Sequence, residues 1–163
     1  MTTITPCLWF DGQAEEAARF YSSVIPGSRV DKVERSAVDY PAGKAGDVLL
    51  VLFTLAGAPY QALNGGSTYR FTPAVSLSVS CADQAEVDRI WDALLADGGA
   101  PMACGWLTDR YGLSWQIVPA AFERLMRSGD KAGIARAMTA MMGMIKLDEA
   151  ALRRAFEGGE DAR

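Results

Sequence analysis

The apolar and polar positions predict one order of elements, strand, helix and then further strands, twice along the chain. Short alternating runs indicate half-exposed strands, and apolar residues at the helical repeat indicate amphipathic helices. The order repeats while the residues do not, so we expect two similar units, which could pair their sheets around a common cleft. The first set of elements lies at 5–10, 11–25, 29–36, 48–55 and 60–63, and the second at 74–81, 83–95, 102–107 and 113–118.

Each predicted helix of these two units begins after an aspartate. Asp11 precedes the first helix and Asp83 precedes the second. Aspartate is a favoured N-cap residue, because its side chain accepts the free backbone N–H groups of the first turn. Glu86 follows Asp83 at the spacing of a capping box. We therefore expect both helices to be capped from their own N-terminal aspartate.

The end of the chain has a different pattern and predicts three helices, at 120–127, 131–144 and 148–156. The second of these helices carries an apolar stripe that is rich in methionine. Its residues are Ile134, Met138, Met141, Met142 and Ile145. Methionine fills irregular core gaps and also forms adaptable binding surfaces. We favour packing in the core or in a dimer over a groove for a partner peptide.

Composition and charge narrow the class of protein. Of 163 residues, 50% are hydrophobic and 22% charged, which is typical of a globular domain. The net charge is −4 without a basic stripe, so we expect no nucleic-acid partner. The longest apolar run, residues 48–58, is too short to span a membrane, and the N-terminus lacks a secretory signal pattern. These features predict a cytoplasmic protein without a membrane partner.

The chain has no histidine and only three cysteines, Cys7, Cys81 and Cys104. An odd number of widely spaced cysteines without a CxxC pair argues against a disulfide framework or a zinc site. The lack of histidine removes the usual general base, the Ser-His and Cys-His nucleophile pairs, and the commonest ligand of transition metals. We expect Cys7 and Cys81 to be packing residues.

The densest group of chemically capable residues is the predicted hairpin 104–119, CGWLTDRYGLSWQIVP. Cys104 is a candidate nucleophile, although a buried, inert thiol is the more frequent case. Asp109 is a candidate general acid or base, although aspartate before a tight turn is also a common structural choice. In the last strand, Gln116 and Ser114 should share one face, opposite Trp115 and Ile117. They need hydrogen-bond partners there, which either a polar pocket or solvent would supply.

The sequence lacks the common phosphate-binding motifs. It has no Walker A pattern and no GxGxxG after a strand. Asn64-Gly65-Gly66 could form a backbone nest for an anion, but we favour a turn that ends a strand.

Five stretches carry a resemblance to a known family: ITPCLWFDGQAEEAARFY, ALNGG, VDRIWDALLADGG, CGWLTDRYGLSWQIVP and MIKLDEAALRRAF. They resemble the PhnB-like branch of the vicinal oxygen chelate superfamily, which includes glyoxalase I, bleomycin-resistance proteins and extradiol dioxygenases. The resemblance implies an α+β fold of paired βαβββ modules, here with a C-terminal helical extension, and usually a homodimer.

In metal-using relatives four strand positions supply the ligands. By eye these positions fall near Pro6, Tyr60 or Gln61, Ala74 and Gln116. Proline and alanine cannot ligate through their side chains, so we expect no metal and no other cofactor. The branch is sometimes labelled demethylubiquinone methyltransferase-like. Because the sequence has no glycine-rich adenosylmethionine loop after its first strand, we do not carry this activity over.

We expect one glyoxalase-like domain, 1–163, made of a first module at 1–67, a second at 68–119 and a helical tail at 120–163. The predicted function is metal-free binding of a small molecule, related to sequestration by bleomycin-resistance proteins. Two alternatives stay open: a non-metal enzyme that uses Cys104 or Asp109, and a dimeric interaction protein that uses the methionine-rich tail. The predicted ligand contacts are Trp9, Asn64, Trp106, Tyr111, Ser114 and Gln116.

Overall fold

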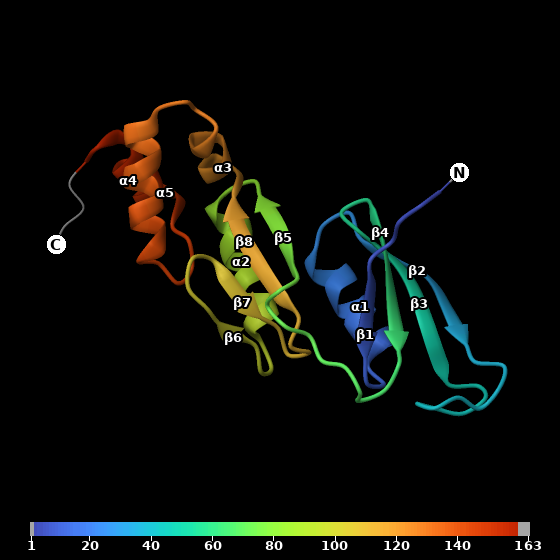
Figure 1. The fold of residues 1–163 in the computed structure, drawn as a ribbon. Helices are drawn as coiled ribbons and strands as arrows, with labels where there is room; N and C mark the ends of the chain where they lie inside the picture. The colour runs from blue at the N-terminus through green and yellow to red at the C-terminus, as the bar shows by residue number, and fades with distance from the viewer. Residues whose placement is uncertain (1, 160–163) are drawn as a thin grey trace. The chain divides into compact units, whose positions relative to one another are not determined.

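The computed structural model describes residues 2–159 and divides into two compact units, of which the first ends at Phe71 and the second begins at Thr72. Figure 1 shows the elements of both units in chain order. The helical tail belongs to the second unit. The first unit contains β1 (Cys7–Phe10), α1 (Ala14–Val24), β2 (Arg29–Arg35), β3 (Val48–Leu55) and β4 (Ala58–Asn64).

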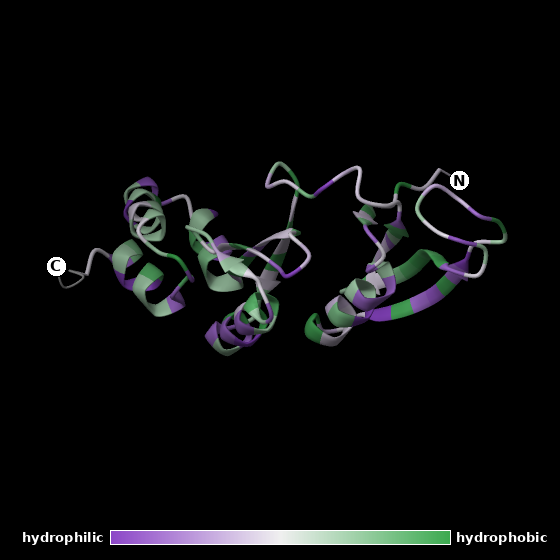
Figure 2. Ribbon diagram, turned by 90° about the horizontal axis from the view of Figure 1, so that it is seen from below, coloured by the Kyte–Doolittle hydropathy of each residue, from purple (hydrophilic) through white to green (hydrophobic). Residues whose placement is uncertain are grey.

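The first unit is a four-stranded mixed sheet with one helix packed on it. The strand order is β1-β4-β3-β2, with β1 parallel to β4 and the other neighbours antiparallel. In Figure 2 the edge strand β2 is banded in hydrophilic and hydrophobic colours, whereas β3 beside it is almost continuously hydrophobic. The pattern fits a solvated edge next to a buried strand. Tyr21 and the alanines of α1 are buried on the helix side that faces the sheet.

The second unit repeats this topology and adds three helices. Its sheet has the order β5-β8-β7-β6, with β5 parallel to β8. The doubled plan predicted from the sequence is therefore confirmed. The elements are β5 (Ser76–Cys81), α2 (Gln84–Leu95), β6 (Ala100–Pro101), β7 (Trp106–Thr108), β8 (Ser114–Pro119), α3 (Ala120–Met126), α4 (Lys131–Met142) and α5 (Glu149–Glu157).

The two module helices start in different ways, and the prediction is right for only one of them. Asp83 accepts a hydrogen bond from the N–H of Glu86 at 2.9 Å, and the Glu86 side chain accepts from the N–H of Ala82. Asp11, however, does not cap α1, which begins at Ala14 without a cap from its own N-terminal side chain. The Ala14 N–H donates instead to Oδ1 of Asn64, 50 residues along the chain.

The strand predicted at 102–107 is also wrong over most of its length. Residues 102–105 form a turn between β6 and β7, in which Cys104 and Gly105 have φ angles of 60° and 80°. Their N–H groups donate to the carbonyls of Met144 and Ile145 at 2.8 Å. The turn is thus bonded to the helical tail instead of to a neighbouring strand.

The tail has a small core of its own, built from Phe122, Ala137, Leu147 and Leu152. Met141 of the predicted stripe packs against this core. Met138, Met142 and Ile145 of the stripe are 45%, 62% and 53% exposed, so they do not pack in this core, and packing of these residues in a dimer stays a prediction. None of the helices within residues 2–159 is long and apolar enough to cross a membrane.

Candidate functional site

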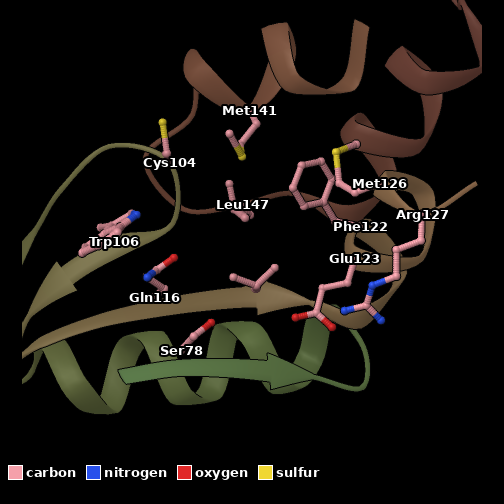
Figure 3. Close-up of a pocket in the computed structure, with 11 residues that line it drawn as sticks. Ser78, Cys104, Trp106, Gln116, Phe122, Glu123, Met126, Arg127, Met141 and Leu147 are labelled. Atoms are coloured by element: carbon pink, nitrogen blue, oxygen red, sulfur yellow. The ribbon is translucent and has the colours of Figure 1, made fainter. Parts of the chain in front are cut away.

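A pocket of about 360 Å³ lies between the sheet of the second unit and its C-terminal helices. This volume is at the lower end of the range of small-molecule sites. Figure 3 shows the lining side chains on the side of the sheet away from α2, with α3 and α4 opposite the strands. All of its walls belong to the second unit.

The floor of the pocket is a row of three side chains across three strands. In the sheet register Gln116 of β8 pairs with Ser78 of β5 on one side and with Trp106 of β7 on the other. Because side chains alternate along a strand, Trp115 and Ile117 point to the opposite face, where they are buried. The predicted orientation of Gln116 is therefore confirmed.

The opposite wall is apolar and comes from the tail. Phe122 and Met126 lie on α3, Met141 lies on α4, and Leu147 precedes α5. This wall offers an aromatic ring and two thioethers, which adapt to irregular or planar ligands. A ligand in the pocket would thus touch a polar floor on one side and an apolar wall on the other.

Several polar groups of the pocket are available for a ligand. Nε2 of Gln116 donates to the Ser76 hydroxyl at 2.9 Å, whereas its Oε1 has no partner within residues 2–159. The indole N–H of Trp106 is likewise without a partner in the part of the chain that the structure describes. One oxygen of Glu123 accepts a hydrogen bond from the Ser80 hydroxyl at 3.0 Å. The pocket therefore keeps free donors and acceptors beside an apolar surface.

Ser114 lies on the same face of the sheet as Gln116 but does not line the pocket. It is fully buried, and its hydroxyl finds no hydrogen-bond partner among the described residues. A buried hydroxyl of this kind is normally satisfied by protein or by an ordered water. The contact between Ser114 and a ligand stays a prediction. The structure does not support it, because the hydroxyl is buried and does not line the pocket.

Cys104 lines the pocket and is half-buried. In Figure 3 its sulfur points away from Gln116 and Trp106. No structural observation supplies the base that would activate it, so its role as a nucleophile stays a prediction. Among the other thiols, Cys81 is buried as predicted, but the expectation that Cys7 packs inside is wrong, because this residue is exposed.

Asp109 and Tyr111 lie outside the pocket. Asp109 is 2% exposed, and its carboxylate oxygens accept hydrogen bonds from the N–H groups of Tyr111 and Leu113 and from the indole of Trp115. These contacts fix the turn between β7 and β8. The geometry therefore supports the structural interpretation of Asp109, and this residue does not line the pocket.

The two remaining candidates, Trp9 and Asn64, lie in the first unit. Both ends of the Asn64 amide bond to backbone, Oδ1 to the Ala14 N–H and Nδ2 to the Val48 carbonyl, both at 2.9 Å. The side chain is buried and both ends of its amide are engaged, so a contact between Asn64 and a ligand stays a prediction that the geometry does not support. Its role is to join β4, β3 and the start of α1.

The Asn64-Gly65-Gly66 segment is a turn, as favoured from the sequence. The N–H groups of both glycines donate to the carbonyl of Phe10, so they do not form an anion nest. The indole of Trp9 lies over this turn and donates to the Gly66 carbonyl at 2.7 Å. A Cβ on Gly65 would come within 2.2 Å of the Trp9 ring, which explains why glycine is needed there.

Sequence reasoning missed the half of the pocket that the tail supplies. Glu123 lines it from the first turn of α3 and Arg127 from just after this helix, and neither was a candidate. Their spacing of four residues places both on one helix face, which was the available signal. The pattern could not indicate that this face meets β8.

The residues at the four expected metal positions offer few side-chain donors. Pro6 has no side-chain donor, and its carbonyl already accepts from the N–H of Gln61 at 2.9 Å. Ala74 offers no donor either, which leaves only Gln61 or Tyr60 and Gln116. Over residues 2–159, no three His, Cys, Asp or Glu side chains gather in a group that could hold a metal ion.

Comparisons with known proteins agree on the two-module region. A family model described as 3-demethylubiquinone-9 3-methyltransferase matches residues 2–118. Among solved structures, a Bacillus cereus PhnB protein, described as a candidate 3-demethylubiquinone-9 3-methyltransferase, is 36% identical with a TM-score of 0.66. The match covers 73% of this chain and 100% of that one.

More distant structures share the fold alone. Protein PA1353 from Pseudomonas aeruginosa is 22% identical with a TM-score of 0.57, over 71% of this chain and 95% of that one. The fosfomycin resistance protein FosX from Mesorhizobium loti is 13% identical with a TM-score of 0.51, over 77% and 98%. Among curated proteins, none matches the chain.

Proposed function

The chain belongs to the PhnB-like, 3-demethylubiquinone-9 3-methyltransferase family and has the glyoxalase-like fold of the vicinal oxygen chelate superfamily, and from this premise we propose that it binds a small organic molecule without a metal. The observation that carries the proposal is the pocket of the second unit, with free polar groups on its floor and an apolar wall opposite. Gln116 would hydrogen-bond the ligand, and Trp106 would pack against it.

The family description names a methyl transfer, but this chain gives no support for that activity. The connection from β1 to α1 reads Asp11-Gly12-Gln13 and lacks the glycine-rich pattern of a cofactor-binding loop. The carboxylate that the sequence offers as a base, Asp109, is engaged in its turn and does not line the pocket. Binding is therefore the function that the site supports best, while the homodimer and the cytoplasmic location stay predictions.

A fragment screen by ligand-observed NMR tests the proposal. We expect amphipathic aromatic fragments to bind the wild-type protein and to lose binding in the double variant Trp106→Ala with Gln116→Ala. Gln61→Ala is a matched control, because Gln61 pairs with β1 in the first sheet as Gln116 pairs with β5 in the second. Circular dichroism and melting curves would verify that the variants are folded.

Two results would overturn the proposal. If the same fragments bind the double variant normally, or if only Gln61→Ala loses them, the site is elsewhere. Native mass spectrometry and metal analysis of protein purified without chelators give the second test. A stoichiometric metal whose removal abolishes fragment binding would contradict metal-independent binding.

A further inference from the structure

One end of the pocket carries one acidic and one basic side chain. Glu123 lies on α3 and Arg127 follows its last turn, four residues later. Figure 3 places both at the same end of the pocket, with Trp106 and Cys104 at the other end. No ion pair joins either side chain to another charged group within residues 2–159. The two opposite charges are therefore available together.

These two groups differ in what they can bind. The planar guanidinium of Arg127 suits a carboxylate, which it can hold through two parallel hydrogen bonds. The Ser80 hydroxyl donates to Oε2 of Glu123 and thereby orients the carboxylate, whose other oxygen can accept from an ammonium group. A simple anion would meet repulsion from Glu123, and a simple cation would meet repulsion from Arg127.

Pairing between Glu123 and Arg127 themselves does not prevent this use. They stand at the spacing at which an exposed Glu–Arg pair stabilises a helix by only about 0.2–0.5 kcal/mol. A ligand that carries both charges can replace such a weak contact on each side.

Building on the function proposed above, we propose that the ligand is a zwitterion of the amino-acid type with a large apolar side chain. Its carboxylate would bind Arg127, and its ammonium group would bind Glu123. Its side chain would extend between Trp106 and the wall formed by Phe122 and Met141, all of which line the same pocket. The volume of about 360 Å³ suits one amino acid better than a peptide.

Specificity of this kind would belong to the tail. The family model ends at residue 118, before α3 begins at Ala120. Both charged residues and the apolar wall therefore lie beyond the matched region, while Gln116 and Trp106 lie within it. The shared fold would supply the floor, and the tail would supply the recognition of charge.

Four probes with one aromatic ring separate the contributions by calorimetry: L-phenylalanine, 3-phenylpropionate, phenethylamine and 3-phenylpropanol. Each of the other three probes lacks one or both of the charges of L-phenylalanine. We expect L-phenylalanine to bind at least about tenfold more tightly than each of them, which is the gain that one charge-assisted hydrogen bond would give. Equal binding of 3-phenylpropanol would overturn the zwitterion and leave the proposed binding function intact.

Two variants that each remove one charge assign the two contacts. Arg127→Gln should remove the preference for L-phenylalanine over phenethylamine but keep its preference over 3-phenylpropionate. Glu123→Gln should have the opposite effect. Arg124→Gln is the control, because Arg124 lies on the same helix, is exposed and does not line the pocket.

The remaining outcomes are also distinct. If the variants leave both preferences unchanged, other residues recognise the charges and the assignment is wrong. If none of the four probes binds, the ligand class is wrong, and the fragment screen decides separately whether the pocket binds small molecules at all.

Discussion

Replacement of Asp109 should lower the free energy of unfolding of the second unit more than replacement of an exposed aspartate does. Three N–H donors converge on its carboxylate at 2.8, 3.1 and 2.9 Å, and the residue is 2% exposed. A hydrogen bond to a charged group contributes about 1.5–3 kcal/mol, and the cost of burying the carboxylate offsets part of the sum. We expect Asp109→Ala to lower the free energy of unfolding by about 4 kcal/mol.

Asp109→Asn gives a sharper version of this test. The amide keeps the oxygen that faces Tyr111 and Leu113 but presents an NH₂ group to the Trp115 indole, so two donors face each other. The expected loss is about 2–3 kcal/mol. Asp97→Asn is the matched control, because Asp97 is 72% exposed in its ion pair with Arg110 and should cost at most about 1 kcal/mol.

Urea unfolding, followed by tryptophan fluorescence and circular dichroism, measures these differences. The slopes should stay equal, so that the shift of the midpoint reports stability alone. If the two asparagine variants unfold at the same urea concentration, the carboxylate does not hold the turn and the reasoning fails. A folded Asp109→Asn protein should still bind fragments, because Asp109 does not line the pocket.

Three further predictions concern the first unit and the thiols. Asn64→Ala should lower the free energy of unfolding in urea by about 2–3 kcal/mol, because the Ala14 N–H and the Val48 carbonyl both lose a buried partner. A loss below about 0.5 kcal/mol would refute the role of Asn64 in joining β4, β3 and α1. Gly65→Ala should displace the Trp9 indole, shift its fluorescence and cost about 1–3 kcal/mol. Gly143→Ala should be neutral, because its Cβ would make only an ordinary van der Waals contact, 3.5 Å from the Ala140 carbonyl oxygen. Equal melting temperatures of the two variants would contradict the contact between Gly65 and Trp9. Burial raises the pKa of Cys81 to about 12, so iodoacetamide at about pH 8 should label this thiol only after unfolding. Peptide mass spectrometry locates the label. Rapid labelling of Cys81 in the folded protein would show that the thiol is accessible and would contradict the prediction.

The doubled plan was predictable because it depends on local patterns. Alternation along β5 and β8 decides which side chains face α2, and Asp83 caps a helix that begins one residue later. The start of α1 was not predictable in this way. Its cap comes from Asn64 in β4, so the contact exists only once the first sheet has formed.

The same distinction explains the errors in the second unit. The prediction of a strand over 102–105 fails because the N–H groups of Cys104 and Gly105 bond to carbonyls of the tail, which a local pattern cannot reveal. Helical periodicity identified an apolar stripe on α4 without indicating which of its residues meet a neighbour. Met141 faces the pocket, while Met138 and Met142 stay exposed.

The tail therefore supplies one wall of the pocket on the second sheet. Its docking rests on specific contacts with the module: Gln84 of α2 donates to the Leu147 carbonyl and accepts from the Glu149 N–H, and Lys146 pairs with Asp88. The hydrogen bond from Lys146 also lowers the pKa of the Asp88 carboxyl. Because these contacts hold the apolar wall against Gln116 and Trp106, a relative could keep the modules and lack the pocket. Ligand preference in this family should then follow the tail more closely than it follows identity over residues 2–118.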